Sequence, residues 1–254
     1  MSAVEYKEVH LSYKKNPHNK ALLQRLEEIS LSERAKEAIQ NLNFVDVEEI
    51  SNNGGHVYPE VWIKMLDTFP KELSTELLSH YVKYCRINNK VRTKALEVLG
   101  EGAIDIIVPG ITLYLKFFNK ILNTCSIDGT KKFLIKMAKT PNTRIDDFEV
   151  ERKILRVFPD EDLRDILRAF VDGLPWMSEC LFLKIFDIFP KEEVKELLMK
   201  AIKNDMDIWR PTLRKIVDFF PKGDAEELIE AFWKTSPGKN CYTFEKDEIA
   251  KLLK

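Results

Sequence analysis

Hydrophobic side chains recur along this chain with the period of an α-helix. The segments after residues 70, 159, 190 and 221 open with charged, mostly acidic side chains and then carry apolar residues at i, i+3, i+4 and i+7. That spacing places the apolar side chains on one face of a helix. Alternating β-branched runs of strand length are nearly absent. The pattern therefore predicts an all-α protein.

The helical pattern is also an internal repeat. The dipeptide Phe-Pro closes a hydrophobic segment at 69–70, 158–159, 189–190 and 220–221, and the last three copies lie 31 residues apart. Proline before an acidic first turn is typical of a helix start, because the N–H that proline lacks has no partner there and carboxylates favour the positive helix end. The repeat unit is therefore predicted to be a helix pair of about 31 residues. Six segments carry the pattern, two of them degenerate: 63–70, 93–100, 119–126, 152–159, 183–190 and 214–221.

One copy carries a family resemblance. Residues 88–100, NNKVRTKALEVLG, resemble the second helix of a HEAT-like repeat, in which a polar turn leads into Val-Arg, Ala-Leu and Leu-Gly. Residues 146–159 and 204–221 follow the same pattern more loosely, and the resemblance covers roughly residues 45–235. The short period is closer to the compact HEAT-like repeats of bilin-lyase type than to standard units of 40–47 residues. The resemblance implies a right-handed α-solenoid of about six to seven helix pairs.

The domain organisation follows from the repeat. We expect one domain over residues 1–254, since none of the short linker-like stretches is typical of a domain boundary. A helix pair cannot bury its apolar face alone, so neighbouring pairs stack and share a continuous core. In this arrangement residues 1–45 form an N-terminal helical cap, residues 46–235 form the HEAT-like repeats and residues 236–254 form a C-terminal capping helix.

The third repeat, residues 101–126, departs from the others. It predicts a short apolar helix over 103–108, a Pro-Gly break, and a long helix over 111–124. Its apolar side chains are too many for one narrow helix stripe. Either neighbouring repeats enclose them or some form a patch for a partner or a second copy; enclosure is the default, because large exposed apolar patches are rare. The residues are Ile104, Ile106, Ile107, Val108, Ile111, Leu113, Leu115, Phe117 and Phe118.

Net charge changes this picture only locally. The chain has 40 Lys plus Arg and 41 Asp plus Glu, so as a whole it does not attract nucleic acid or an anionic membrane. Residues 111–158, however, carry 10 basic and 5 acidic side chains between acidic ends. This basic segment fits either a solvated helix face or a patch for an anionic partner, nucleic acid included.

The cysteines and the N-terminus indicate the compartment. The four cysteines are widely spaced and form no CxxC pair, which favours reduced thiols over a disulfide framework or a zinc site. The N-terminus is charged throughout, and no apolar stretch reaches the roughly 20 residues that a bilayer requires. We therefore expect a cytoplasmic protein without a membrane segment.

Searches for catalytic motifs give no convergent set. HExxH, GxSxG, the phosphate-binding loop and the His-Glu pairs of HEAT-like hydroxylases are all missing. The sequence gives no reason to expect an enzyme, a cofactor or a metal. Trp176 and Trp209 fit two interpretations: core between repeats, or rings that stack on a base, as resemblance to HEAT-like alkylpurine glycosylases would imply.

A ladder of lysines supplies the candidate binding residues. Lysine occupies one position in six successive second helices, and the residue three places on is usually acidic, which puts both on one exposed face. In HEAT-like stacks this face lines the concave groove, so the resemblance implies rows of charge along it. The lysines are Lys64, Lys94, Lys120, Lys153, Lys184 and Lys215; the residues three places on are Asp67, Glu97, Asn123, Arg156, Asp187 and Asp218.

The middle of the ladder lacks acids. Most rungs are expected to tie helices together through ion pairs, but Asn123 and Arg156 replace the acid beside Lys120 and Lys153. We therefore predict that a partner binds there, with Lys120, Lys153 and Arg156 as its main contacts and Lys184 and Lys215 further along the groove. The function this favours is a non-catalytic scaffold for a protein or acidic peptide. The alternative is a nucleic-acid-binding or DNA-repair protein of glycosylase type.

Overall fold

A computed structural model describes residues 63, 66–67, 71–82 and 87–235 of the chain. The described part is mostly helical, which confirms the all-α prediction. The predicted N-terminal cap, residues 1–45, and the predicted C-terminal capping helix, residues 236–254, lie outside the described residues. No helix of the described part is long and apolar enough to cross a membrane.

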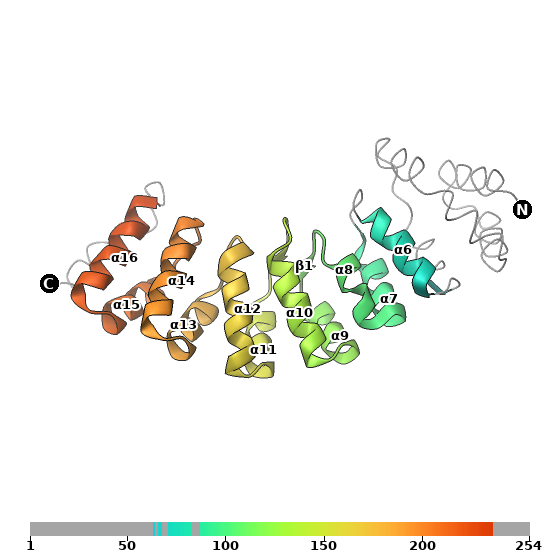
Figure 1. Ribbon diagram of the computed structural model, residues 1–254, viewed down its shortest axis with the longest axis horizontal. Coiled ribbons are helices and arrows are strands. Elements are labelled where there is room, and N and C mark those ends of the chain that lie inside the picture. The colour runs from blue at the N-terminus through green and yellow to red at the C-terminus, as the bar shows by residue number, and fades with distance from the viewer. Residues whose placement is uncertain (1–62, 64–65, 68–70, 83–86, 236–254) are drawn as a thin grey trace, which may run out of the picture. The chain divides into compact units, whose positions relative to one another are not determined.

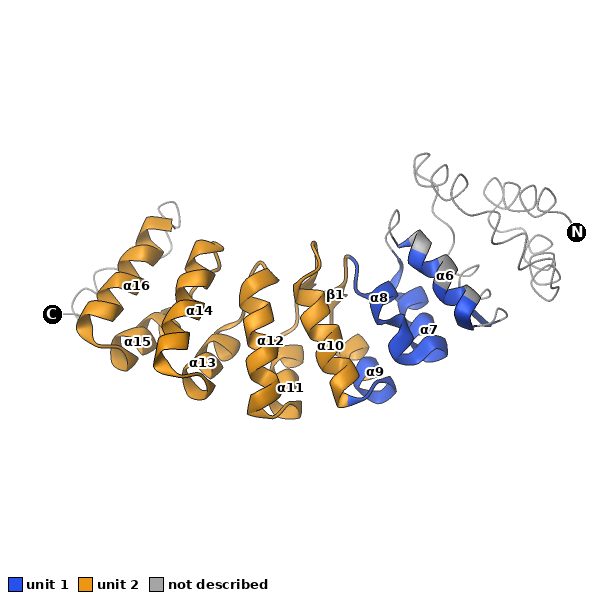
Figure 2. Ribbon diagram, viewed as in Figure 1, with its two compact units in different colours: residues 1–109, 120–126 blue, residues 110–119, 127–254 orange. Residues whose placement is uncertain are grey.

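The chain divides into two compact units, coloured separately in Figure 2. Unit 1 comprises residues 1–109 and 120–126, and unit 2 comprises residues 110–119 and 127–254, so the boundary passes through one helix, α9. In unit 1, α6 and α7 pack against each other and against α8. Its described elements are α6 (Lys71–Tyr81), α7 (Asn89–Leu99), the 3₁₀ turn η1 (Gly100–Ala103), α8 (Ile104–Ile107) and the end of α9 (Leu115–Thr124).

Unit 2 is built from helices that pack against the helix two places on. One layer consists of α10, α12, α14 and α16, which lie side by side in Figure 1, and the other contains α11, α13 and α15. Contacts between α12 and α13 and between α15 and α16 join the layers. The helices are α10 (Ile127–Ala138), α11 (Phe148–Val157), α12 (Asp160–Gly173), α13 (Glu179–Ile188), α14 (Lys191–Lys203), α15 (Arg210–Phe219) and α16 (Lys222–Thr235).

The Phe-Pro dipeptides separate helices as predicted. Helices α11, α13 and α15 each end one residue before the phenylalanine, whose backbone is extended. A following proline disfavours the helical conformation, and this forces the break. The next proline is the N-cap of α12 and of α14, which both carry acidic side chains in their first turn. Each phenylalanine turns inward: Phe158, Phe189 and Phe220 are buried.

The secondary structure of the third repeat differs from the one that the sequence predicts. The predicted helix over 111–124 begins only at Leu115, because residues 112–113 form a short strand, β1. This strand pairs in parallel with β2, Arg144–Ile145, within unit 2. Pro109 and Gly110, the latter at φ +64°, break the chain before it. The predicted enclosure is confirmed for most of the apolar residues: Ile104, Ile106, Ile107, Val108, Ile111, Leu113 and Phe118 are buried, while Leu115 and Phe117 are half-buried.

Helices α10 and α12 approach very closely at their C-terminal ends. A Cβ atom built on Gly173, the last residue of α12, would lie 1.9 Å from the backbone oxygen of Ala138. Only glycine fits at this contact without moving a backbone. The approach fixes the two helices against each other.

Candidate functional site

The ladder lysines of unit 2 lie on three successive helices of one layer and are spaced 31 residues apart. In α11, α13 and α15 each lysine precedes a buried isoleucine, which fixes its orientation. Because the isoleucine faces the core, the lysine stem lies at the edge of the packed face and its ammonium reaches the surface. The three lysines are half-buried: Lys153, Lys184 and Lys215.

Three of the five ladder lysines that the structure describes are ion-paired, each with an acid outside its own helix. In unit 1, Lys94 pairs with Asp67, and Lys120 pairs with Glu97 of α7 at 2.9 Å. The expectation that Lys120 lacks a counter-charge is therefore wrong. Its partner is the acid three places after the preceding ladder lysine, so Asn123 on its own helix does not decide its pairing.

In unit 2 the pairing differs from helix to helix. Lys184 pairs with Asp160 at the start of α12, with 2.9 Å between Nζ and Oδ1. Lys153 donates instead to the side-chain oxygen of Asn119, a neutral group. Neither Lys215 nor Arg156 has an ion pair or a hydrogen-bond partner among the described residues. Of the predicted binding residues, α11 therefore brings together Lys153 and Arg156, one helical turn apart.

A third cation lies on α9, the helix that carries the partner of Lys153. Lys116 is exposed on α9, one turn before Asn119, and belongs to unit 2 with α11. Residues three apart share a helix face, so Lys116 lies beside the amide that receives Lys153. Arg152, by contrast, pairs with Glu149 on its own helix at 2.8 Å. We call Lys116, Lys153 and Arg156 the cation cluster.

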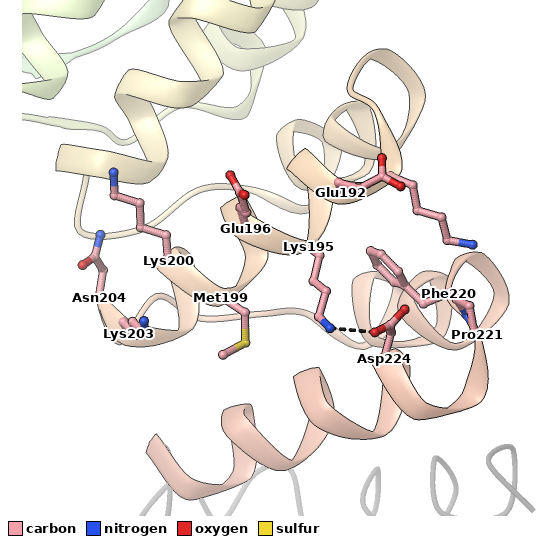
Figure 3. Close-up of a pocket in the computed structure, with 11 residues that line it drawn as sticks. Glu192, Lys195, Glu196, Met199, Lys200, Lys203, Asn204, Phe220, Pro221 and Asp224 are labelled. Carbon is pink, nitrogen blue, oxygen red and sulfur yellow. Dashed lines mark hydrogen bonds and ion pairs between the residues drawn. The ribbon is translucent and has the colours of Figure 1, made fainter.

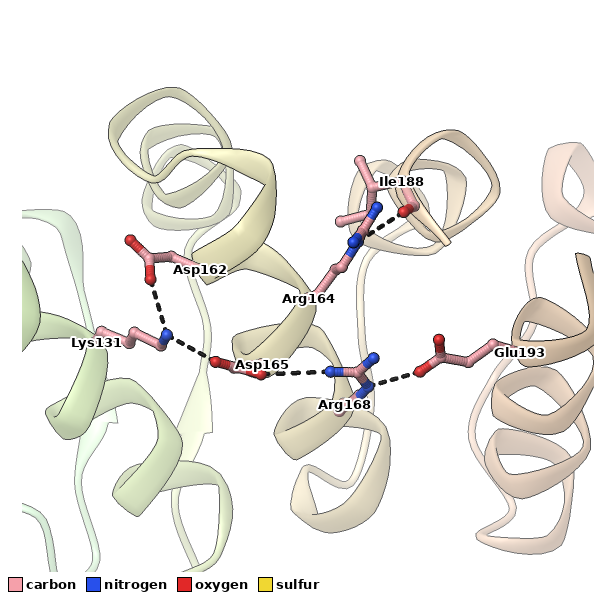
Figure 4. A network of polar contacts seen from close by, with 7 residues as sticks. All are labelled: Lys131, Asp162, Arg164, Asp165, Arg168, Ile188 and Glu193. Atoms are coloured by element: carbon pink, nitrogen blue, oxygen red, sulfur yellow. Dashed lines mark hydrogen bonds and ion pairs between the residues drawn. The ribbon is translucent and has the colours of Figure 1, made fainter. Parts of the chain in front are cut away.

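A second row of ion pairs lies on the other layer, and the sequence reasoning missed it. Lys131 of α10 reaches forward to Asp162 at 2.8 Å and Asp165 at 2.7 Å, both on α12 (Figure 4). These hydrogen bonds raise the pKa of Lys131 to about 12. Lys195 of α14 repeats the arrangement with Asp224 and Glu227 of α16, both at 2.6 Å.

The contacts of α12 with α13 and α14 use different groups. Arg164 donates to the main-chain oxygen of Ile188, and Arg168 bridges Asp165 to Glu193, which Figure 4 shows. The guanidinium of Arg168 also lies 5.2 Å from the ring of Phe189. These contacts tie helices of unit 2 to one another.

An open hollow lies along α14 (Figure 3). Its volume is about 1020 Å³. Lys195 spans it to Asp224, and Lys191 lies over the rings of Phe219 and Phe220. Cations and carboxylates alternate in its lining, so it favours no ligand of one charge. The lining residues are Lys191, Glu192, Lys195, Glu196, Met199, Lys200, Lys203, Asn204, Phe220, Pro221 and Asp224.

A buried carboxylate stands between α11 and α13. Glu151 is 1% exposed and accepts a hydrogen bond from the Ser178 N–H at 3.3 Å. Burial raises its pKa above the ordinary value. The Ser178 hydroxyl lies 3.0 Å from the sulfur of Cys180, whose pKa burial also raises. A thiol with a raised pKa is a poor nucleophile at neutral pH, so this trio is not an activated cysteine site.

The two tryptophan candidates differ in exposure. Trp209, the N-cap of α15, is 42% exposed, so the core interpretation is wrong for this ring. Trp176 is half-buried in the turn before α13. Cys125 and Cys180 are free thiols. Within the described ranges, no group of three or more His, Cys, Asp or Glu side chains is placed to hold a metal ion.

Comparisons with known proteins identify no relative of this chain. No model of a protein family matches this chain, and no curated protein or solved structure matches it either.

Proposed function

We propose that this chain is a right-handed HEAT-like α-solenoid that acts as a non-catalytic scaffold, and that the cation cluster binds an acidic segment of a partner protein. The solenoid part of this proposal is supported by the two-layer packing of unit 2, in which helix pairs recur every 31 residues. Pairs of this kind bury their apolar faces only by stacking on neighbours.

One observation carries the binding part. Three residues after the ladder lysine, α13 and α15 carry Asp187 and Asp218, whereas α11 carries Arg156. The lysine of α11 is also held by a neutral amide rather than by a carboxylate. An excess of uncompensated cations at one place attracts an anionic partner and guides its approach.

The chemistry of the cluster suits carboxylates. The guanidinium of Arg156 presents a planar fork that can bind a carboxylate through two parallel hydrogen bonds. Lys153 adds a positioned ammonium, because Asn119 restrains it. Arg156 also lies in the last turn of α11, where a cation favours the negative end of the helix. That second role is small, so the binding role can be separated from stability.

Fluorescence anisotropy with a labelled Asp/Glu-rich peptide tests the proposal on the full chain. The double variant Lys153→Glu/Arg156→Glu should weaken binding at least about tenfold, since each lost charge-assisted contact is worth about 1 kcal/mol or more. The matched control is Lys203→Glu/Lys215→Glu, which changes net charge equally and alters one ladder lysine and one last-turn cation. Equal losses in both variants would contradict a localised site.

A nucleic acid is the second candidate partner. The basic segment 111–158 and the exposed ring of Trp209 favour it, because aromatic rings stack on bases and cations contact phosphates. The same assay with labelled single-stranded and duplex DNA decides between the two. Binding tighter than about 1 μM near 150 mM salt, with a slope of several counterions and a loss in Trp209→Ala, would replace the acidic peptide by DNA.

A further inference from the structure

Glu151 occupies a core position that is apolar in the equivalent helices. The corresponding residue is Phe182 in α13 and Leu213 in α15, both fully buried. Glu151 is itself 1% exposed, and its second carboxylate oxygen, Oε2, has no hydrogen-bond partner. A buried carboxylate with an unpartnered oxygen is destabilising when it is ionised. Such a group calls for a physical explanation.

The partners of Glu151 compensate its charge only in part. The start of α13 offers the positive end of a helix and the hydroxyl and N–H of Ser178, which lower the pKa of Glu151 but act against the larger effect of burial. The N···O distance to the Ser178 N–H, 3.3 Å, is at the long limit for a hydrogen bond. Asp147, before α11, adds negative charge that opposes ionisation, and the neutral thiol of Cys180 faces it from α13. The nearest cation along α11, Arg152, pairs with Glu149 at the surface.

We propose that the contact between α11 and α13 is a pH-dependent joint, which is closed while Glu151 is neutral and loosens when Glu151 ionises. The neutral carboxyl is buried at small cost, whereas the carboxylate needs solvent or a cation that the core does not supply. Glu151 accepts its bond from Ser178, the N-cap of α13, so rehydration of the carboxylate must part this end of α13 from α11. The joint is a property of the fold and does not depend on any partner.

The direction of the pH effect follows from linkage. Burial raises the pKa of Glu151 in the folded chain above its value in the unfolded chain. Its contribution is therefore fully favourable below the unfolded pKa and is lost as pH rises through the folded pKa. Above that pKa the population of the loosened joint should grow up to about tenfold per pH unit.

Hydrogen exchange measured by mass spectrometry on the full chain, from about pH 4 to about pH 9, tests the joint. After correction for intrinsic exchange, protection of amides 178–186 should fall with pH in the wild type and stay constant in Glu151→Gln, which mimics the neutral acid. Amides 212–219 of α15 should behave alike in both proteins. Glu151→Leu serves the same purpose if the glutamine variant folds poorly. Protection that is independent of pH in the wild type, or changes equally in the variants, would overturn the joint.

The joint also bears on binding, and this consequence rests on the proposed function, since α11 carries Lys153 and Arg156. We compare the affinity of Glu151→Gln for the Asp/Glu-rich peptide with that of the wild type. The ratio of the two affinities should rise at least threefold from about pH 4 to about pH 9. Taking the ratio removes the titration of the peptide itself. A constant ratio beside a responsive joint would overturn regulation alone. Absence of peptide binding at every pH would contradict the proposed function, while the exchange data would still decide the joint.

Discussion

Helices α11 and α13 are two copies of one repeated helix, and they differ at two positions in whether the side chain is charged and in the sign of its charge. Both have ten residues, both end before an extended phenylalanine, and both carry a ladder lysine in the same place. Yet α11 buries Glu151 where α13 buries Phe182, and it exposes Arg156 where α13 exposes Asp187. The shared positions account for the fold. The differing positions carry stability costs or uncompensated charge, and they are where function is to be sought.

The largest expected effect contrasts the two buried positions. Phe182→Ala removes a fully buried ring from the α13 core and should lower the free energy of unfolding by about 3–5 kcal/mol. Glu151→Ala removes a carboxylate whose burial is unfavourable, so it should cost far less and can be neutral. Denaturant unfolding of both variants measures the difference. Similar losses would mean that Glu151 supports the core as Phe182 does.

The next prediction concerns a substitution that makes the buried position of α11 apolar, as it is in α13. Glu151→Leu places an apolar side chain at the buried position and should raise the free energy of unfolding by about 1–3 kcal/mol at neutral pH. Since the pKa of Glu151 is raised in the folded chain, the gain should shrink as pH falls toward the ordinary carboxyl value of 4.5. Thermal unfolding of both proteins over a pH series measures it. A gain that grows on acidification would contradict the assignment.

A smaller difference in unfolding free energy is expected between losing ion pairs that join two helices and losing a pair within one helix. Lys131→Gln breaks two contacts to α12 and should cost up to about 1 kcal/mol, because such surface pairs are well screened. Lys234→Gln breaks one exposed contact to Glu230 within α16 and should cost at most about 0.5 kcal/mol.

The pH dependence distinguishes these two substitutions further. The pKa of Asp165 is lowered by its bond from Lys131, so the loss in Lys131→Gln should fade as pH drops below the ordinary carboxyl range. At the alkaline side it should fade as pH approaches the raised value of about 12 for Lys131. Urea unfolding across this range, at low and high salt, checks both. Equal costs for Lys131 and Lys234 would mean that the bridge between helices adds nothing.

The sequence predicted the helix pairs well because their signals are local. Phe158, Phe189 and Phe220 each precede a proline, and that dipeptide sets both a helix end and a helix start. The strand β1 was missed because two residues are too short for any periodicity, and its pairing with β2 is not local. The prediction of a single domain and of a HEAT-like solenoid stays a prediction.

The site was predicted only in part, for two physical reasons. Glu151 lies just outside the repeated motif, which begins at the next residue, so its apolar counterparts were not aligned with it. Acids such as Asp162 and Asp224 were attributed to the positive helix ends, although they also bind Lys131 and Lys195. The recurrence of a cation at the same place in α10, α12 and α14 was the signal that could have revealed this row.

The central claim is that Arg156, in place of an acid beside the ladder lysine Lys153, creates the binding site. Exchanging the acid and the cation between α11 and α15 tests it most directly. Calorimetric titration of the Asp/Glu-rich peptide should show affinity falling at least about tenfold in Arg156→Asp. Adding Asp218→Arg to that variant places a cation beside Lys215, which has no ion pair in the described part of the chain, and should restore at least part of the affinity. Undiminished binding by Arg156→Asp would contradict the account.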